Sequence, residues 1–193
     1  MKRNNLELKA QANNYPSLQL SDRHLCDLEL IMNGGFSPLS GFMSKDDYRS
    51  VINNLRLKDG SLWPIPITLD VDDEFIKKIS NSPKIALRNK EGFVLAVLNI
   101  EDVWKPNLEV EAESIFGSKD IVHPGVRYLL KTSKKNYIGG KIERIANPHH
   151  YDYQNLRHTP AELIGIFENK KWNKVIAFQT RNPLHKAHFE LTK

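Results

Sequence analysis

The hydrophobic pattern of the first quarter of the chain has the period of helices. In residues 21–35, apolar side chains at positions 25, 28, 31 and 32 share one helical face, a serine precedes them and two glycines follow. A serine cap and a glycine stop are typical of the two ends of a helix. Ser44 opens the sequence SKDD, which is typical of a capping box and predicts a second helix through Ile52.

The middle of the chain changes to the period of strands. WPIPITLDV (residues 63–71) alternates apolar and other residues, and its two prolines indicate an edge strand. KIALRNKEGFVLAVLNI (84–100) predicts a hairpin with its turn at 89–92. NYIGGKIERI (136–145) predicts a further strand, whose glycines indicate a bulge. Short strands and tight turns favour a small barrel or sandwich with helices packed on it.

After Arg144 the chain becomes polar and aromatic, and this stretch is interpreted as a linker. Thr159 and Glu162 then form a capping box around a proline at the first helical position, which predicts a helix. An apolar strand at residues 175–178 and another helix follow. This order of helix, buried strand, loop and helix is typical of a parallel α/β sheet, so the end of the chain is predicted to open a second domain.

Composition narrows the class of protein. Apolar residues make up 40% of the 193, enough for a packed core, and the net charge of +5 favours an anionic partner. The longest apolar stretch, residues 93–100, is far shorter than the roughly 20 residues of a membrane helix, and no signal peptide is recognisable. Cys26 is the only cysteine, which favours the cytoplasm. Its place beside Leu25 predicts a buried, unreactive thiol.

The densest chemistry lies in QTRNPLHKAH, residues 179–188. Asn182 is a favourable helix cap before Pro183, so a helix is expected to begin just beyond the carboxyl end of the strand, where open α/β sheets bind ligands. The N–H groups of such a helix end attract anions, and the planar guanidinium of Arg181 suits an oxyanion. His185 and His188 share one helical face. There is no GxxxxGK[ST] loop, so the pattern indicates an oxyanion and phosphate site of another kind.

AFQTRNPLHKAH (177–188) resembles the sulfate- and ATP-binding motif of the ATP sulfurylase family. Four further segments are similar to that family in the same order: GGFSPLSGFM, WPIPITLDV, HPGV and RHTPAEL. The resemblance implies an α+β chain, with a β-rich PUA-like N-terminal domain and packed helices at residues 1–157. Residues 158–193 would then be the beginning of an α/β, Rossmann-like nucleotidyltransferase domain that is truncated here.

The family reaction transfers the adenylyl group of ATP to sulfate and yields adenosine 5′-phosphosulfate and pyrophosphate. The resemblance implies that six residues contact ATP: Gln179, Thr180, Arg181, Asn182, His185 and His188. Among them, Gln179 and Arg181 would also bind sulfate. The catalytic residues would be Thr180, Arg181 and Asn182, which stabilise the transition state. Departures from the family pattern are Lys186, where arginine is common, and Phe189, where an acidic residue is common; both put contacts in doubt rather than the chemistry.

The resemblance further implies that no cofactor or metal is bound by protein residues, and that Mg²⁺ arrives with ATP. The parent enzyme would form an oligomer of identical subunits in the cytoplasm, and this fragment alone would be inactive. His149, His150 and Asp152 are interpreted as a solvated linker, and His123 and the segment GFSPLSGF (residues 35–42) as structural. Two alternatives stay open: a PUA-like module that binds RNA, and a nucleotidyltransferase with another acceptor. Nucleic acid is not the expected partner, because the basic residues form no stripe with aromatic ones, and a membrane is not expected because the apolar stretches are too short.

Overall fold

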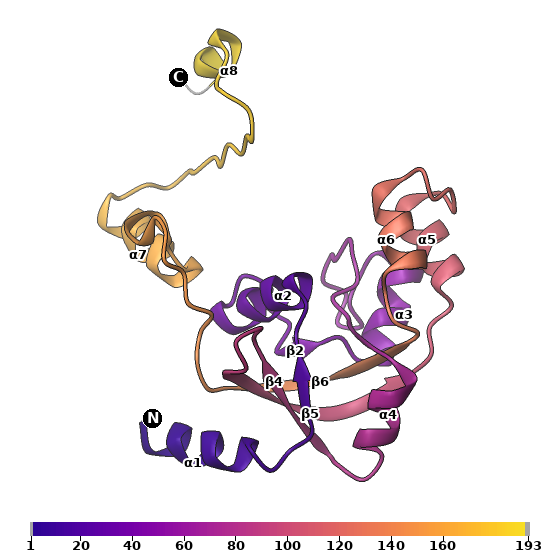
Figure 1. The fold of residues 1–193 in the computed structure, drawn as a ribbon. Helices are drawn as coiled ribbons and strands as arrows, with labels where there is room; N and C mark the ends of the chain where they lie inside the picture. Colours follow the sequence, from indigo (N-terminus) through magenta and orange to yellow (C-terminus); the bar gives the residue numbers. More distant parts are fainter. Residues whose placement is uncertain (1, 192–193) are drawn as a thin grey trace. The chain divides into compact units, whose positions relative to one another are not determined.

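The computed structural model describes residues 2–191, which form two compact units. The first runs to Gln154 and the second begins at Asn155. The helices of the first unit are α1 (Lys2–Ala12), α2 (Asp22–Asn33), α3 (Lys45–Asn54), α4 (Asp73–Ile79), α5 (Leu108–Phe116) and α6 (Pro124–Lys131) (Figure 1). Its strands are β1 (Ser17–Gln19), β2 (Gly41–Phe42), β3 (Leu69–Val71), β4 (Lys84–Arg88), β5 (Val94–Trp104) and β6 (Asn136–Arg144).

The two helices predicted near the N-terminus are confirmed as α2 and α3. Ser21 caps α2 by accepting a hydrogen bond from the backbone N–H of His24, and Gly34 ends the helix in the left-handed conformation at φ 86°. Ser44 caps α3 in the same way, accepting from the N–H of Asp47. Sequence patterns identified these ends because a cap is made by residues within one helical turn of each other.

The six strands form one mixed sheet in the order β1-β4-β5-β6-β2, with β3 paired to β6. The predicted hairpin is confirmed as β4 and β5, which are antiparallel. β3 is an edge strand, as its prolines indicated, but it is shorter than predicted. It begins at Leu69, because Pro64 and Pro66 have no N–H to donate to a neighbouring strand.

Helices cover both faces of the sheet. Val94 and Val97 of β5, on either side of a register shift in the β4–β5 pairing, pack with Ala12 of α1, whereas Leu95, Ala96 and Leu98 belong to the main core. In β4, Ile85 and Leu87 pack in the main core with α2, whereas Ala86 faces the other way and packs with Ala12. This alternation follows from the period of two in a strand. The sequence-based class, an α+β domain rich in strands with helices packed on them, is therefore confirmed for the first unit.

The predicted bulge lies opposite the glycines rather than at them. Ile100 of β5 pairs with Gly140 of β6 and Asp102 pairs with Gly139, so Glu101 is the extra residue. A Cβ on Gly140 would lie 1.9 Å from the carbonyl oxygen of Asn99. The glycines are therefore required by the close approach of neighbouring backbones.

The second unit contains α7 (Pro160–Asn169) and α8 (Lys186–Leu191), preceded by a 3₁₀ turn η1 (Gln154–Leu156). The capping box predicted for α7 is present between Thr159 and Glu162. The prediction of a strand at residues 175–178 is wrong for this chain: the segment between α7 and α8 is irregular (Figure 1). A strand needs a neighbour for its backbone groups, and no strand in the described part of the chain pairs with it.

Within residues 2–191, no helix has both the length and the apolar character needed to cross a membrane.

Candidate functional site

The loop before α8 holds the residues expected to form the site, and its first part closes into a tight turn. The hydroxyl of Thr180 donates a hydrogen bond to the carbonyl oxygen of Asn182 at 3.1 Å and accepts one from the N–H of Asn182 at 3.2 Å. Such side-chain turns fix the local direction of the backbone. The side chains of Gln179 and Arg181 flank Thr180 and are exposed to solvent. The turn thus orders the centre of the motif and leaves its two proposed sulfate ligands accessible.

The turn changes where the helix begins. Asn182 was predicted to cap a helix starting at Pro183, but α8 starts at Lys186. A capping residue uses its carbonyl oxygen for the first hydrogen bond of the helix. In Asn182 that oxygen accepts from the Thr180 hydroxyl, and the first helical hydrogen bond runs from the N–H of Phe189 to the carbonyl of His185.

The two histidines lie together at the start of α8, as their spacing predicted. Their ring centroids are 5.6 Å apart, and the ring of Phe178 lies 5.6 Å from that of His188. The backbone N–H of His185 donates to Nδ1 of His188 at 3.4 Å. A nitrogen that accepts carries no proton, so the neutral His188 ring holds its proton on Nε2. This Nε2–H can donate to an anionic oxygen.

The chemistry available in the loop is therefore hydrogen-bond donation and positive charge in solvent. A guanidinium, an amide and an imidazole N–H can all bind a tetrahedral oxyanion or a phosphate. Within the described residues, no group of three or more histidine, cysteine, aspartate or glutamate side chains could hold a metal ion.

A buried ionic cluster in the first unit escaped the sequence analysis. Asp70 is 7% exposed, and its carboxylate contacts Nη2 of Arg23 at 2.5 Å, Nε2 of His24 at 2.8 Å and the N–H of Lys134 at 2.7 Å. Burial raises the pKa of Asp70, but the hydrogen bonds from His24 and Lys134, with the nearby positive charges, lower it to about 2. His24 and Asp70 are 46 residues apart, so no local spacing could have indicated the pair.

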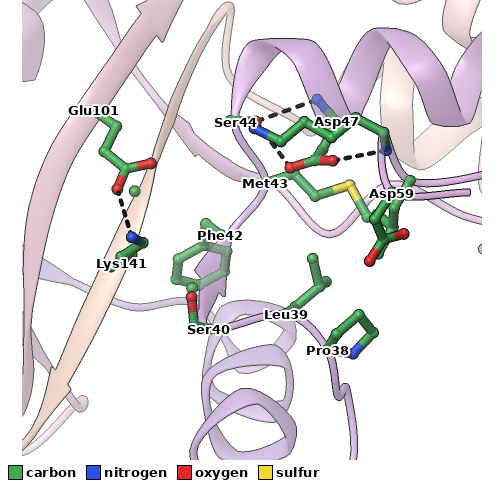
Figure 2. Close-up of a pocket in the computed structure, with 14 residues that line it drawn as sticks. Pro38, Leu39, Ser40, Phe42, Met43, Ser44, Asp47, Asp59, Glu101 and Lys141 are labelled. Atoms are coloured by element: carbon green, nitrogen blue, oxygen red, sulfur yellow. Dashed lines mark hydrogen bonds and ion pairs between the residues drawn. The ribbon is translucent and has the colours of Figure 1, made fainter. Parts of the chain in front are cut away.

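The segment GGFSPLSGFM, interpreted as structural, lines a pocket of about 310 Å³ (Figure 2). Its Ser37–Pro38 peptide bond is cis. Asp47 accepts hydrogen bonds there from the Ser44 hydroxyl and the Lys58 N–H, so its carboxylate is occupied in holding the loop. Phe42 and Met43 of the segment lie in the main core, which agrees with a structural role.

Three other side chains were assigned from sequence. His123 is structural as expected, because its ring accepts a hydrogen bond from the N–H of Val126 and caps α6. His150 is not simply a solvated linker residue: its Nε2 contacts the carboxylate of Glu29 at 2.8 Å. Cys26 was expected to be buried but is exposed. Two residues along a helix correspond to about 200°, so Cys26 faces away from the buried Leu28.

Both parts of the chain are similar to known proteins. Residues 1–147 match the family model described as a PUA-like domain, and residues 154–193 match the model described as ATP-sulfurylase. The chain is 48% identical over 192 residues to a sulfate adenylyltransferase of Saccharomyces cerevisiae, and 52% identical over 189 residues to one of Phaeosphaeria nodorum.

These matches cover 100% and 96% of this chain but only 37% and 33% of the two relatives, so the chain spans about a third of their length. A solved structure described as a hexameric APS kinase from Thiobacillus denitrificans is 34% identical, with a TM-score of 0.75 over 98% of this chain and 33% of that one.

Proposed function

The chain belongs to the PUA-like domain family, and from this premise we propose that it is the N-terminal part of a sulfate adenylyltransferase. The reaction would be transfer of the adenylyl group of ATP to sulfate, with release of pyrophosphate. The observation that carries the proposal is the loop of residues 179–188. It combines an ordered turn, an exposed arginine and a histidine pair, and it lies within the part of the chain that matches the ATP-sulfurylase family.

We assign the roles by the chemistry of each side chain. Gln179 and Arg181, on either side of Thr180, would bind sulfate through an amide and a planar guanidinium. Sulfate is a weak nucleophile, so it has to be held in line with the leaving pyrophosphate. Thr180 and Asn182 would keep the loop in shape and, with Arg181, stabilise the charge of the transition state.

The two histidines would bind the phosphates of the nucleotide. In the described geometry Nε2 of His188 is the nitrogen that carries the proton, and it can donate to a phosphate oxygen of ATP. His185 lies beside it and would contact the same phosphates. Mg²⁺ would come with ATP, coordinated mainly by phosphate oxygens and water, because Mg²⁺ retains its waters strongly.

The proposal extends to organisation. We place the domain boundary at residues 157/158, with a PUA-like domain before it and the beginning of a nucleotidyltransferase domain after it. The parent protein would be a cytoplasmic oligomer of identical subunits. Support for an oligomer comes from the similar protein of Thiobacillus denitrificans, which is described as hexameric.

The test uses the full-length parent protein and measures pyrophosphate release from ATP with and without sulfate. Arg181→Ala should abolish the sulfate-dependent rate, and Arg181→Lys should restore little, because a point charge does not replace two parallel N–H donors. Arg127→Lys, an exposed arginine on α6, is the matched control and should retain full activity. A near-normal rate in Arg181→Lys would show that the paired N–H donors of the guanidinium are not needed. Absence of any sulfate-dependent release in the wild-type protein would overturn the function itself.

A further inference from the structure

The first unit contains a cavity that the proposed reaction does not use. Its volume is about 270 Å³, and it lies between the segment before β3 and the pair of helices α5 and α6. The segments WPIPITLDV and HPGV, which were given no part in catalysis, meet in its wall. The wall is mainly apolar and includes Ile65, Pro66, Ile115, Phe116, Leu129 and Tyr137.

A carboxyl group stands in this apolar wall. Glu111 of α5 is only 6% exposed. Its Oε2 accepts hydrogen bonds from the hydroxyl groups of Tyr48 at 2.9 Å and Tyr137 at 3.0 Å. Within the described residues its other oxygen, Oε1, receives no hydrogen bond. Burial raises the pKa of Glu111 despite the two tyrosine hydrogen bonds, so removal from water is the larger effect at this carboxyl.

Arg23, the cationic side chain beside the cavity, is already paired with two carboxylates. Nη1 of Arg23 contacts Asp27 at 3.1 Å, and Nη2 contacts Asp70 and the carbonyl oxygen of Thr68. A ligand with a negative charge would therefore find no free partner and would meet Glu111. Oε1 is not among the fully buried atoms without a partner, so it stays accessible from the cavity. A hydrogen bond to a carboxylate is among the stronger ones, so a donor delivered to Oε1 inside this largely apolar space would be bound favourably.

We propose that this cavity binds a small, uncharged, mostly apolar ring compound that donates one N–H or O–H hydrogen bond to Glu111. The size agrees with one or two fused rings: about 150 Å³ holds benzene, and ordinary ligand pockets begin at about 300 Å³. All of the residues concerned lie in the first unit, so the inference stands whether or not the proposed sulfate chemistry is correct.

The test compares two ligands of nearly equal shape on the 193-residue chain. Indole donates an N–H, whereas benzofuran has an oxygen in that place and donates nothing. Each is titrated while backbone amide NMR signals are followed. Indole should shift the signals of Gly125 and Ser133, which line the cavity, and should bind at least about tenfold more tightly than benzofuran. Equal affinities, or no shift by either compound up to millimolar concentration, would refute the proposal.

Substitutions locate the binding. Ile65 is 46% exposed in the wall, so Ile65→Trp can fill the cavity without entering the core, and it should abolish indole binding. Val122→Trp introduces the same side chain at a residue that is 78% exposed and does not line the cavity, and it should bind indole normally.

Glu111→Gln keeps an oxygen that accepts from the two tyrosines, and its amide N–H₂ takes the place of Oε1. The cavity then offers a donor instead of an acceptor, so the preference should change from indole to benzofuran. If this variant does not fold, the comparison of indole with benzofuran and of Ile65→Trp with Val122→Trp still tests the proposal. Indole binding that survives Ile65→Trp would place it elsewhere and overturn the inference.

Discussion

Replacement of Asp70 by asparagine should destabilise the first unit more than any single exposed substitution. The aspartate accepts hydrogen bonds from two side chains and one backbone N–H in a buried position. A pKa lowered from 3.8 to about 2 corresponds to about 2.5 kcal/mol of stability at neutral pH. Breaking a buried ion pair from one side typically costs about 3–5 kcal/mol, because the partner's charge stays buried. We therefore expect Asp70→Asn to lose about 3 kcal/mol.

The sign of the pH dependence follows from the direction of the shift. Because the pKa of Asp70 is lower in the folded state, its stabilisation is complete above the unfolded pKa of 3.8 and is lost as pH falls towards about 2. At pH 3 about half of the contribution remains. The difference in free energy of unfolding between wild type and Asp70→Asn should thus narrow by about 1 kcal/mol between pH 6 and pH 3.

Urea unfolding at pH 6, 4 and 3, followed by circular dichroism, measures this difference. Asp46→Asn is the control, since Asp46 is an exposed aspartate of α3, and it should change stability by no more than about 0.5 kcal/mol. A loss below about 1 kcal/mol in Asp70→Asn at pH 6, or a difference that does not change with pH, would show that the cluster is not the ionic network described here.

Three further predictions concern the loop and the sheet. His185→Ala and His188→Ala in the parent enzyme should weaken ATP binding without changing metal content; one zinc per chain, lost in either variant, would contradict the phosphate role. Gly140→Ala should prevent stable folding, because its Cβ would lie 1.9 Å from a backbone oxygen. Gly165→Ala has open space around it and should be neutral or stabilise α7 by up to about 1 kcal/mol. Thermal unfolding of both variants measures the difference. The 193-residue chain alone should release no pyrophosphate in a sulfate-dependent manner. Its amide hydrogens should exchange fast at residues 172–191 and slowly in β5 and β6. Clear turnover would show that the site is complete within this chain.

Features made by neighbouring residues were predictable from sequence, and features made by distant ones were not. The caps at Ser21, Ser44 and Thr159 each depend on one helical turn, and all three were found. The histidine pair was found for the same reason. The Asp70 cluster and the cavity around Glu111 join segments that are far apart in the chain, so no spacing revealed them.

The predicted helix start at Asn182 is wrong, and a local interaction accompanies the difference. Asn182 and Pro183 have the composition of a helix start, but in the structure a side-chain turn joins the Thr180 hydroxyl to the backbone of Asn182. A threonine two residues before a potential cap can form this turn, and that signal was present in the sequence. The helix then begins at Lys186 and has six residues, which is too short to be stable by itself in water.

The second unit explains why its site should depend on further structure. Ile176 is 95% exposed and Phe178 47% exposed, although both belong to an apolar run that was expected to be a buried strand. Apolar side chains and unpaired backbone groups of this kind are stabilised when neighbouring strands cover them. Such a sheet would fix the point from which the Thr180 turn and the histidine pair project, and it would exclude water from the charges that we propose bind sulfate and ATP. Electrostatic catalysis requires both conditions. The motif would thus supply the proposed chemistry, and the geometry for it would come from packing around residues 175–178, which precede it.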